Sequence, residues 1–357
     1  MNLVLTDEQF NPLHLIDNFS SVIWNSRFRD TGDFEIYMYI RNDDILNKVK
    51  LFRYVYIDDK YNVRIILQKK IEFTKENGYA LTITGKTLDF YLDNRIVWNQ
   101  SNYIDRNSVD IIEDLVKNNA CYEYAGDTRG IIDKVRILGG GITNVTAQYR
   151  TQRLTEVLKD LCEQANSGYR VVKRYHYQDE RDEFFLELYN GYDRTINNPN
   201  YIMPVVFDTR LGNVINYSVT YNGDNYKNSA LILGEGDGIS KIEESVGTEQ
   251  GRSRFEMYIN ANDLSQNTGT AQAITLSNYR KMLKENANKY LQNQDIVRTL
   301  EVTIDSNYYK FKADYDLGDL CTVITPLFTA NYRIIEVTES WSDNGYTVEL
   351  NLQEERE

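Results

Sequence analysis

The chain has 357 residues, a formal net charge of −13, and 41% hydrophobic residues. This composition is typical of a globular protein with enough chain for two or three domains with their own cores, and it excludes a disordered chain. The acidic balance argues against a general grip on nucleic-acid phosphates.

The first clear pattern is a pair of strand-like runs on either side of the turn Asp30-Thr31-Gly32-Asp33. Apolar residues alternate with polar ones from Phe34 to Ile40, which predicts one buried face. Gly32 stands between two aspartates, so we expect a tight turn with a positive φ at this glycine. The first run poses a question, because a cleft, a ligand platform or a plain wall would each use its large side chains: Trp24, Arg27 and Phe28.

The remainder of residues 1–100 reads as strands almost throughout. Strands are predicted at 55–57, 63–73 and 79–84, with turns at Asp58-Asp59 and Asn77-Gly78. One short helix is predicted at 43–50, with Asp43 or Asp44 as its cap.

From residue 101 the pattern changes to mixed helix and strand. Ser108 is the predicted cap of a helix with a one-sided apolar stripe. The run "RLTEVLKDLCEQANSG" predicts a second helix that ends at Asn166-Ser167-Gly168. Strand-like runs follow it up to about residue 189.

Strands are predicted again at 211–234 and over most of 299–352. Between them lie a polar, glycine-dotted segment at 234–270 and a helix of about 18 residues that begins near Leu276.

This order predicts an α+β chain that is mainly β, without the βαβ alternation of a doubly wound nucleotide-binding fold. We expect four parts: a first β-domain at 1–100, an α+β middle domain at 101–210, a second β-domain made of 211–235 and 296–357, and an insertion with a loop and a helix at 236–295.

No pattern in the chain demands catalysis, a metal or a cofactor. His14 and His176 are isolated, and neither an H-E-x-x-H motif nor a G-x-S-x-G elbow is present. Gly139-Gly140-Gly141 lacks the Lys-Ser/Thr of a phosphate loop and is interpreted as a flexible turn. The segments at 222–225 and 234–238 resemble calcium loops in composition but lack the alternating acids, so they are interpreted as turns.

Paired carboxylates such as Glu243-Glu244 and Asp58-Asp59 suit a glycosidase in type, but the sequence does not show which acids face each other. The sequons at Asn18, Asn144 and Asn216 matter only in a secreted protein. The N-terminal segment has no secretion signal, and no run of about 18 apolar residues predicts a transmembrane helix. The odd number of cysteines predicts reduced, buried thiols in a protein made in a cytosol. Their positions are Cys121, Cys162 and Cys321.

Three stretches together resemble the hub proteins of siphophage tail tips. The first is the opening hairpin, "SVIWNSRFRDTGDFEIYM", with its Trp-containing strand and Gly-Asp-Phe-Glu turn. The second is "YALTITGKTLDFYLDNRIVW" at 79–98, and the third is "ADYDLGDLCTV" at 313–323, followed by the closing strands "YRIIEVTESWSDNGYTVELNL". In the second stretch the matching positions are Gly85, Lys86, Leu88, Leu92, Arg95 and Ile96. The stretches occur in the family's order and cover about a third of the chain, whereas 101–210 and 236–295 match nothing.

The resemblance implies a homotrimer in which each subunit supplies two tube-like β-barrel domains to a ring around an axial DNA channel. It implies a non-enzymatic structural protein of the virion tail tip, made in the bacterial cytoplasm. The implied partners are the distal tail protein, the tail tube, and tail fibres or spikes, without membrane insertion. Larger members of the family carry a peptidase, lysozyme or fibre-like extension, and we expect none of these activities here because the sequence stops at Glu357. On this reading the opening hairpin is a wall, and Trp24 and Phe34 are core or interface anchors.

Acidic residues concentrate at one end of the chain. Residues 301–357 carry 12 acidic and 4 basic side chains, a local charge of −8, whereas residues 1–100 carry 14 and 13. We expect several of these acids to line the channel and repel DNA, apart from the tail residues Glu354, Glu355 and Glu357. The candidates are Glu301, Asp305, Asp314, Asp316, Asp319, Glu336, Glu339, Asp343 and Glu349. The alternative is a surface protein that binds or degrades cell-wall carbohydrate, with some of the 28 tyrosines stacking on sugar rings.

Overall fold

The computed structural model describes residues 1–354 except 41–43, 59–61, 77, 127, 142, 177–180, 237, 262–263, 267–273, 293 and 295. Several sequence predictions fall outside the described residues: the cap at Asp43, the turn residues Asp59 and Asn77, Asp237 of the glycine-rich loop, and the last residues of the acidic tail.

The N-terminal part is an antiparallel sheet with the strand order β2-β1-β5-β6-β7-β4-β3. The strands are β1 (Leu3–Thr6), β2 (Pro12–Ile16), β3 (Ser21–Arg27), β4 (Asp33–Tyr39), β5 (Tyr54–Ile57), β6 (Val63–Thr74) and β7 (Gly78–Thr87), and helix α1 (Asp44–Lys48) follows β4. Alternate residues of these strands are buried in one cluster, which includes Trp24, Phe34 and Ile36. The strands and the short helix predicted from the sequence are therefore confirmed.

The C-terminal part is a second strand-rich unit with the strand order β14-β18-β21-β20. Its strands are β13 (Val206–Asp208), β14 (Val214–Asn222), β18 (Val297–Ile304), β19 (Leu320–Ile324), β20 (Thr329–Ser342) and β21 (Gly345–Glu354), with β19 pairing with β20 on one side and with β13 on the other. Its core contains Val302, Val337 and Leu350, each at most 1% exposed.

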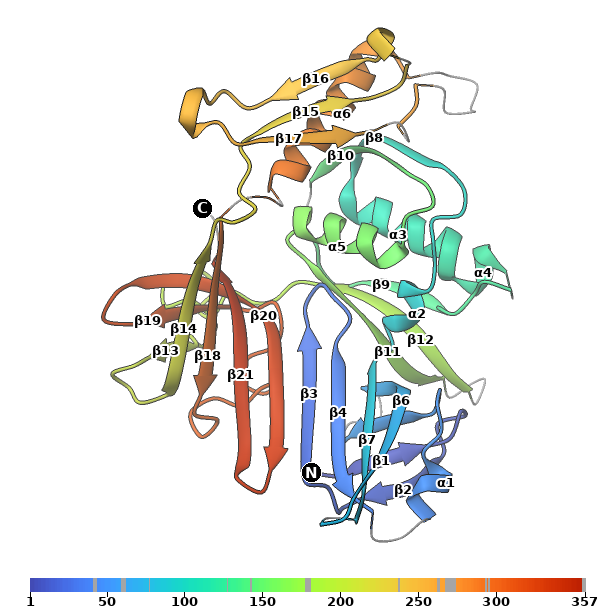
Figure 1. Cartoon of the computed structure of the whole chain (residues 1–357), viewed down its shortest axis with the longest axis vertical. Coiled ribbons are helices and arrows are strands. Elements are labelled where there is room, and N and C mark those ends of the chain that lie inside the picture. The colour runs from blue at the N-terminus through green and yellow to red at the C-terminus, as the bar shows by residue number, and fades with distance from the viewer. Residues whose placement is uncertain are drawn as a thin grey trace.

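The two strand-rich ends of the chain form one continuous sheet, because β3 pairs with β20 from Arg27↔Glu336 to Ser21↔Ser342. β3 and β20 lie side by side at the centre of Figure 1 and join the blue and red strands into a sheet of 13 strands. Within the described residues, the series of paired strands begins at β14 and ends at β2, and these two strands do not pair with each other. The mainly β, α+β class is confirmed, but the strand pairing does not close either end into a barrel of its own.

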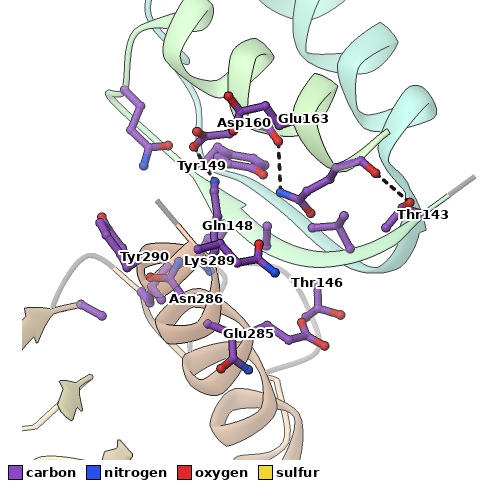
Figure 2. A pocket seen from close by; sticks show the side chains of 18 of the residues that line it. Thr143, Thr146, Gln148, Tyr149, Asp160, Glu163, Glu285, Asn286, Lys289 and Tyr290 are labelled. Atoms are coloured by element: carbon purple, nitrogen blue, oxygen red, sulfur yellow. Dashed lines mark hydrogen bonds and ion pairs between the residues drawn. The ribbon is translucent and has the colours of Figure 1, made fainter. Parts of the chain in front are cut away.

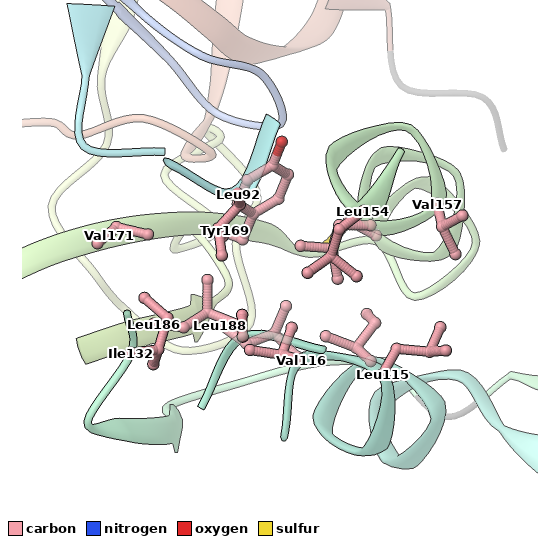
Figure 3. Packing of buried hydrophobic residues seen from close by; sticks show 14 of the residues in the cluster. Leu92, Leu115, Val116, Ile132, Leu154, Val157, Tyr169, Val171, Leu186 and Leu188 are labelled. Atoms are coloured by element: carbon pink, nitrogen blue, oxygen red, sulfur yellow. The ribbon is translucent and has the colours of Figure 1, made fainter. Parts of the chain in front are cut away.

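The middle part packs two helices on a three-stranded sheet of order β11-β12-β9. Its elements are α2 (Phe90–Asp93), β8 (Ser101–Asn107), α3 (Ser108–Ala120), α4 (Tyr122–Ala125), β9 (Lys134–Ile137), β10 (Asn144–Tyr149), α5 (Leu154–Gln164), β11 (Gly168–His176) and β12 (Arg181–Tyr189). Figure 3 shows Leu115 and Val116 of α3 meeting Leu154 of α5, with Leu186 and Leu188 of β12 beside them. Both predicted helices are confirmed, but the α3 cap is Asn107, whose side chain accepts from Val109 N, and not Ser108.

The fourth part packs the long helix α6 (Leu276–Gln292) against a small sheet of order β16-β15-β17 (Figure 1). The remaining elements are β15 (Ser229–Leu233), β16 (Glu243–Val246), β17 (Glu256–Asn260) and the short 3₁₀ turns η1 (Gly238–Ser240) and η2 (Gly251–Ser253). β15 pairs with β16 and β17, which favours a boundary before β15 and not at residue 235. The division of the chain into four domains stays a proposal.

Glycine is required in the opening hairpin for space and not for backbone conformation. Gly32 does not have the positive φ that the sequence predicts. A Cβ at Gly32 would lie 2.4 Å from the Asn25 carbonyl oxygen, which leaves no room for any other residue. Gly318, by contrast, has a positive φ of 86°, and a Cβ there would lie 2.4 Å from the Phe28 ring.

Candidate functional site

A polar face covers one side of the continuous sheet across eight neighbouring strands. Because side chains alternate between the two faces of a strand, the register places these residues opposite the buried cores. The polar face consists of Asn216, Ser218, Glu301, Thr303, Thr347, Glu349, Asn351, Glu336, Thr338, Ser340, Ile23, Asn25, Arg27, Asp33, Glu35, Tyr37, Thr82, Thr84, Gln68, Lys70 and Glu72. With Lys86, which pairs with Asp33 on the same face, it holds six carboxylates and three cations, so its charge is negative.

Arg27 lies where the N-terminal and C-terminal halves of the polar face meet. Its guanidinium contacts Asp33 at 2.7 Å on β4 and Glu336 at 3.1 Å on β20. The Asn25 amide also donates to Glu336. These side-chain contacts add to the backbone hydrogen bonds that join the two halves of the sheet. The alternation of residues along β3 is the sequence signal that places Asn25 and Arg27 on the same face.

Three of the predicted channel acids come together on the C-terminal half of the polar face. Glu301, Glu336 and Glu349 line a shallow groove of about 210 Å³ on β14, β18, β20 and β21. Thr303 lies between them and donates to Asn216 at 2.8 Å. This grouping shows that three acids far apart in the sequence share one surface.

The other predicted channel acids have structural contacts elsewhere. Asp319 is 1% exposed, and it accepts from the Tyr192 amide at 2.7 Å and from Arg194 at 2.8 Å. Burial raises the pKa of the neighbouring Asp316 carboxyl. Asp305 and Asp314 accept from backbone amides of their own turns, and Glu339 lies on the opposite face of β20, where it accepts from the Tyr346 hydroxyl. Asp343 lies in the turn between β20 and β21.

The three large residues of the opening strand have three different positions. Trp24 is 2% exposed and packs against Phe34 in the N-terminal core, with ring centroids 5.3 Å apart. Arg27 lies on the polar face. Phe28 is fully buried, yet it belongs to the C-terminal core, where its ring meets Tyr189 edge-on at 5.3 Å. The residues of this strand therefore anchor both halves of the sheet.

A polar pocket of about 590 Å³ lies between the middle part and α6 (Figure 2). Lys289 of α6 contacts Asp160 of α5 at 2.5 Å, and the Ser265 amide donates to Gln148 of β10 at 3.0 Å. Tyr149, Glu163, Glu285 and Tyr290 also line it. The contacts across it show that the fourth part is held against the middle part by polar side chains.

The sequence candidates for metal or nucleophile chemistry do not converge. Among the described residues, no group of three or more His, Cys, Asp or Glu side chains is placed to hold a metal ion. His14 on β2 lies 3.4 Å from the Lys48 ammonium. Glu244 on β16 contacts Arg280 and Lys284 at 3.2 Å each, as part of the packing of α6.

All three cysteines are buried and free, as predicted. Burial raises the pKa of Cys121 and Cys162 to about 12 and also raises that of Cys321. A raised pKa keeps these thiols protonated, and protonated thiols are poor nucleophiles because the thiolate is the reactive species.

The fold is that of phage tail proteins. The structure matches a tail protein of Neisseria meningitidis MC58 with a TM-score of 0.59, 14% identity, and coverage of 99% of this chain and 97% of that one. It matches the 43 kDa tail protein of prophage MuSo2 from Shewanella oneidensis with a TM-score of 0.60, 12% identity, and coverage of 99% and 98%. The prophage tail protein gp18 of Listeria monocytogenes EGD-e gives a TM-score of 0.51 at 11% identity, with coverage of 100% and 96%.

The chain belongs to the family described as Siphovirus ReqiPepy6 Gp37-like protein, whose model matches residues 2–352. A search of curated protein sequences finds no match. The resemblance to siphophage tail proteins seen in the sequence is therefore confirmed over nearly the whole chain. In the described part of the chain, every helix is too short or too polar to cross a bilayer.

Proposed function

We propose that this chain is a structural hub of a phage tail tip, which forms a homotrimeric ring and joins the tail tube to the distal, host-contacting parts. The family and fold support a structural tail protein. On this proposal the protein is not an enzyme. It is made in the bacterial cytoplasm and resides in the virion, where it contacts the distal tail protein, the tail tube, and tail fibres or spikes.

The observation that carries the proposal is the continuous polar face. One side of the sheet is buried in two cores, whereas the other side is polar from β14 to β6. A surface of this width without a large apolar patch suits a wall that faces water. Because the sheet ends at β2 and β14, its outer strands offer unpaired backbone groups within the described chain, and a closed ring of copies covers such edges.

The charge of the polar face fits an axial channel for DNA. Its six carboxylates outnumber its three cations, and like charge keeps a passing phosphate backbone from adhering. Three copies around an axis would place Glu301, Glu336 and Glu349 in three equivalent sets along the channel.

Solution mass tests the assembly. We expect light scattering to give a trimer, either for the chain alone or for its complex with the neighbouring tail protein. A monomer under both conditions would contradict the hub.

The alternative is a protein that binds or degrades cell-wall carbohydrate, and the pocket between α5, β10 and α6 is the place that favours it. Tyrosines and carboxylates line this pocket, as sugar sites require. If the alternative holds, cell-wall glycan fragments bind the monomer, and Glu285→Gln weakens the binding. If the chain is a hub, the Glu285→Gln variant should assemble like wild type.

A further inference from the structure

One sheet face has a net positive charge in an otherwise acidic molecule. β12 turns Leu186 and Leu188 toward α3 and α5, so the alternate residues of β9, β11 and β12 face away from these helices. This outward side, which we call the basic face, carries five cations and two buried carboxylates, Glu183 and Glu187. The cations are Lys134, Arg136, Arg170, Arg174 and Arg181.

A buried carboxylate orders three of these arginines. Glu187 is 1% exposed, and it accepts from Arg170 at 3.0 Å and contacts Arg136 and Arg174 at 3.4 Å each. The three arginine side chains remain 39 to 47% exposed. Each of the three arginines therefore contacts Glu187 while part of its side chain stays exposed to solvent.

Aromatic rings support two of these arginines. The Arg136 guanidinium lies 5.7 Å from the centre of Phe185, and that of Arg170 lies 4.6 Å from the centre of Tyr189. Side chains held in this way lose little entropy when a partner binds. Ordered arginines beside aromatic residues are also the composition of binding hot spots.

We infer that the basic face docks an acidic surface of a neighbouring copy of this chain, within the trimer proposed above, on which this inference rests. Charge complementarity identifies the partner, because the chain carries −13 overall and a second copy is therefore an acidic molecule. In a cyclic trimer each copy uses two different surfaces, so a basic patch on one copy can meet an acidic patch on the next.

The test is charge reversal at the edge of the basic face. Lys134→Glu/Arg136→Glu should weaken trimer formation roughly tenfold or more, measured by sedimentation equilibrium with and without the neighbouring tail protein. A second variant, Lys134→Glu/Val172→Glu, leaves every Glu187 contact in place and should also weaken trimer formation. Raising the salt concentration should weaken the wild-type trimer but affect the variants less.

The matched control is Lys50→Glu/Lys75→Glu, which changes two exposed cations away from the basic face. The control should assemble like wild type, and all variants should keep the wild-type melting temperature as monomers. Trimers of unchanged affinity in both face variants would overturn the inference and leave the hub intact. Binding of duplex DNA to the wild-type chain, lost in the face variants while assembly persists, would also overturn it. A wild-type chain that never trimerises would instead overturn the proposed function.

Discussion

At the scale of single residues, close backbone approach explains the glycine of the opening turn. A Cβ at Gly32 would strike the Asn25 carbonyl, and it would also lie 3.0 Å from a methyl carbon of Thr87. The Gly32 amide donates to the Thr87 hydroxyl at 3.0 Å, so the turn is packed tightly onto β7. The sequence shows that a glycine belongs here, but backbone contact from a strand across the turn is not visible in a local pattern.

Replacement of Gly32 should therefore destabilise the N-terminal half. We expect Gly32→Val to lower the free energy of unfolding by roughly 1–3 kcal/mol, because the turn must move away from Asn25. Chemical denaturation measures the change. Gly223→Val is the control, since Gly223 does not have a positive φ and a Cβ there would meet only Ile296, at an ordinary contact distance of 3.9 Å. Equal stability of Gly32→Val and wild type would show that the turn adjusts freely.

A buried carboxyl should make stability depend on pH. Asp89 is 4% exposed, and it accepts from the Thr87 hydroxyl at 2.9 Å and from the Val171 amide at 2.5 Å. Burial raises the pKa of this carboxyl from 3.8 to about 6. Because the folded state favours the protonated form, the contribution of Asp89 to stability is full below about pH 4 and is lost as pH rises through about 6.

Asp89→Asn isolates this effect, since the amide keeps the neutral shape at every pH. Relative to wild type, the variant should gain up to roughly 3 kcal/mol of unfolding free energy between pH 4 and pH 7. Denaturation curves at several pH values give the difference directly. A difference that stays constant with pH would mean that Asp89 is ionised at its ordinary pKa in the folded protein.

At the scale of elements, local patterns predict most strands and helices, but not their partners. Alternation from Phe34 to Ile40 predicts β4, and the apolar stripe predicts α5, because burial of one face imposes the period of each element. The pairing of β3 with β20 joins residues about 310 apart, and alternation alone does not specify which strand lies beside which. For the same reason the sequence does not reveal that Glu301, Glu336 and Glu349 share a face, or that β15 pairs with β16 and β17.

Phe28 connects three parts of the structure at the end of β3. A Cβ at Gly168 or Gly318 would lie within 2.4 Å of its ring, so two glycines leave the room that the ring fills. Its backbone amide donates to Ile335 at 2.9 Å, and its carbonyl accepts from Tyr169 at 3.1 Å. The first strand is thereby fixed to the C-terminal core and to β11.

Phe28→Ala should open a cavity at this connection and lower the free energy of unfolding by roughly 3–5 kcal/mol. Phe52→Ala is the control, because Phe52 is 59% exposed and its truncation should cost little. Thermal and chemical denaturation of both variants test the prediction. A loss for Phe28→Ala no larger than that of the control would show that Phe28 does not fasten the two halves.

At the scale of the whole molecule, the polar face gives the proposed hub a specific electrostatic role. Charge reversal by Glu301→Lys/Glu349→Lys would turn a repulsive patch into one that attracts phosphates. We expect particles that carry this change to assemble normally but to eject DNA more slowly, as followed by dye fluorescence after receptor triggering. Asp343→Lys, in the turn beyond the groove, is the control and should eject at the wild-type rate. Unchanged ejection in the double variant would contradict a channel lined by these acids.

The central claim is that the polar face surrounds an axial channel in a ring of three copies. An electron cryomicroscopy reconstruction of the chain assembled with its neighbouring tail protein tests this most directly. The account predicts three copies around one axis, with Glu301, Glu336 and Glu349 of each copy directed at that axis. A reconstruction with these side chains on the outer surface, or with a single copy beside the axis, would contradict it.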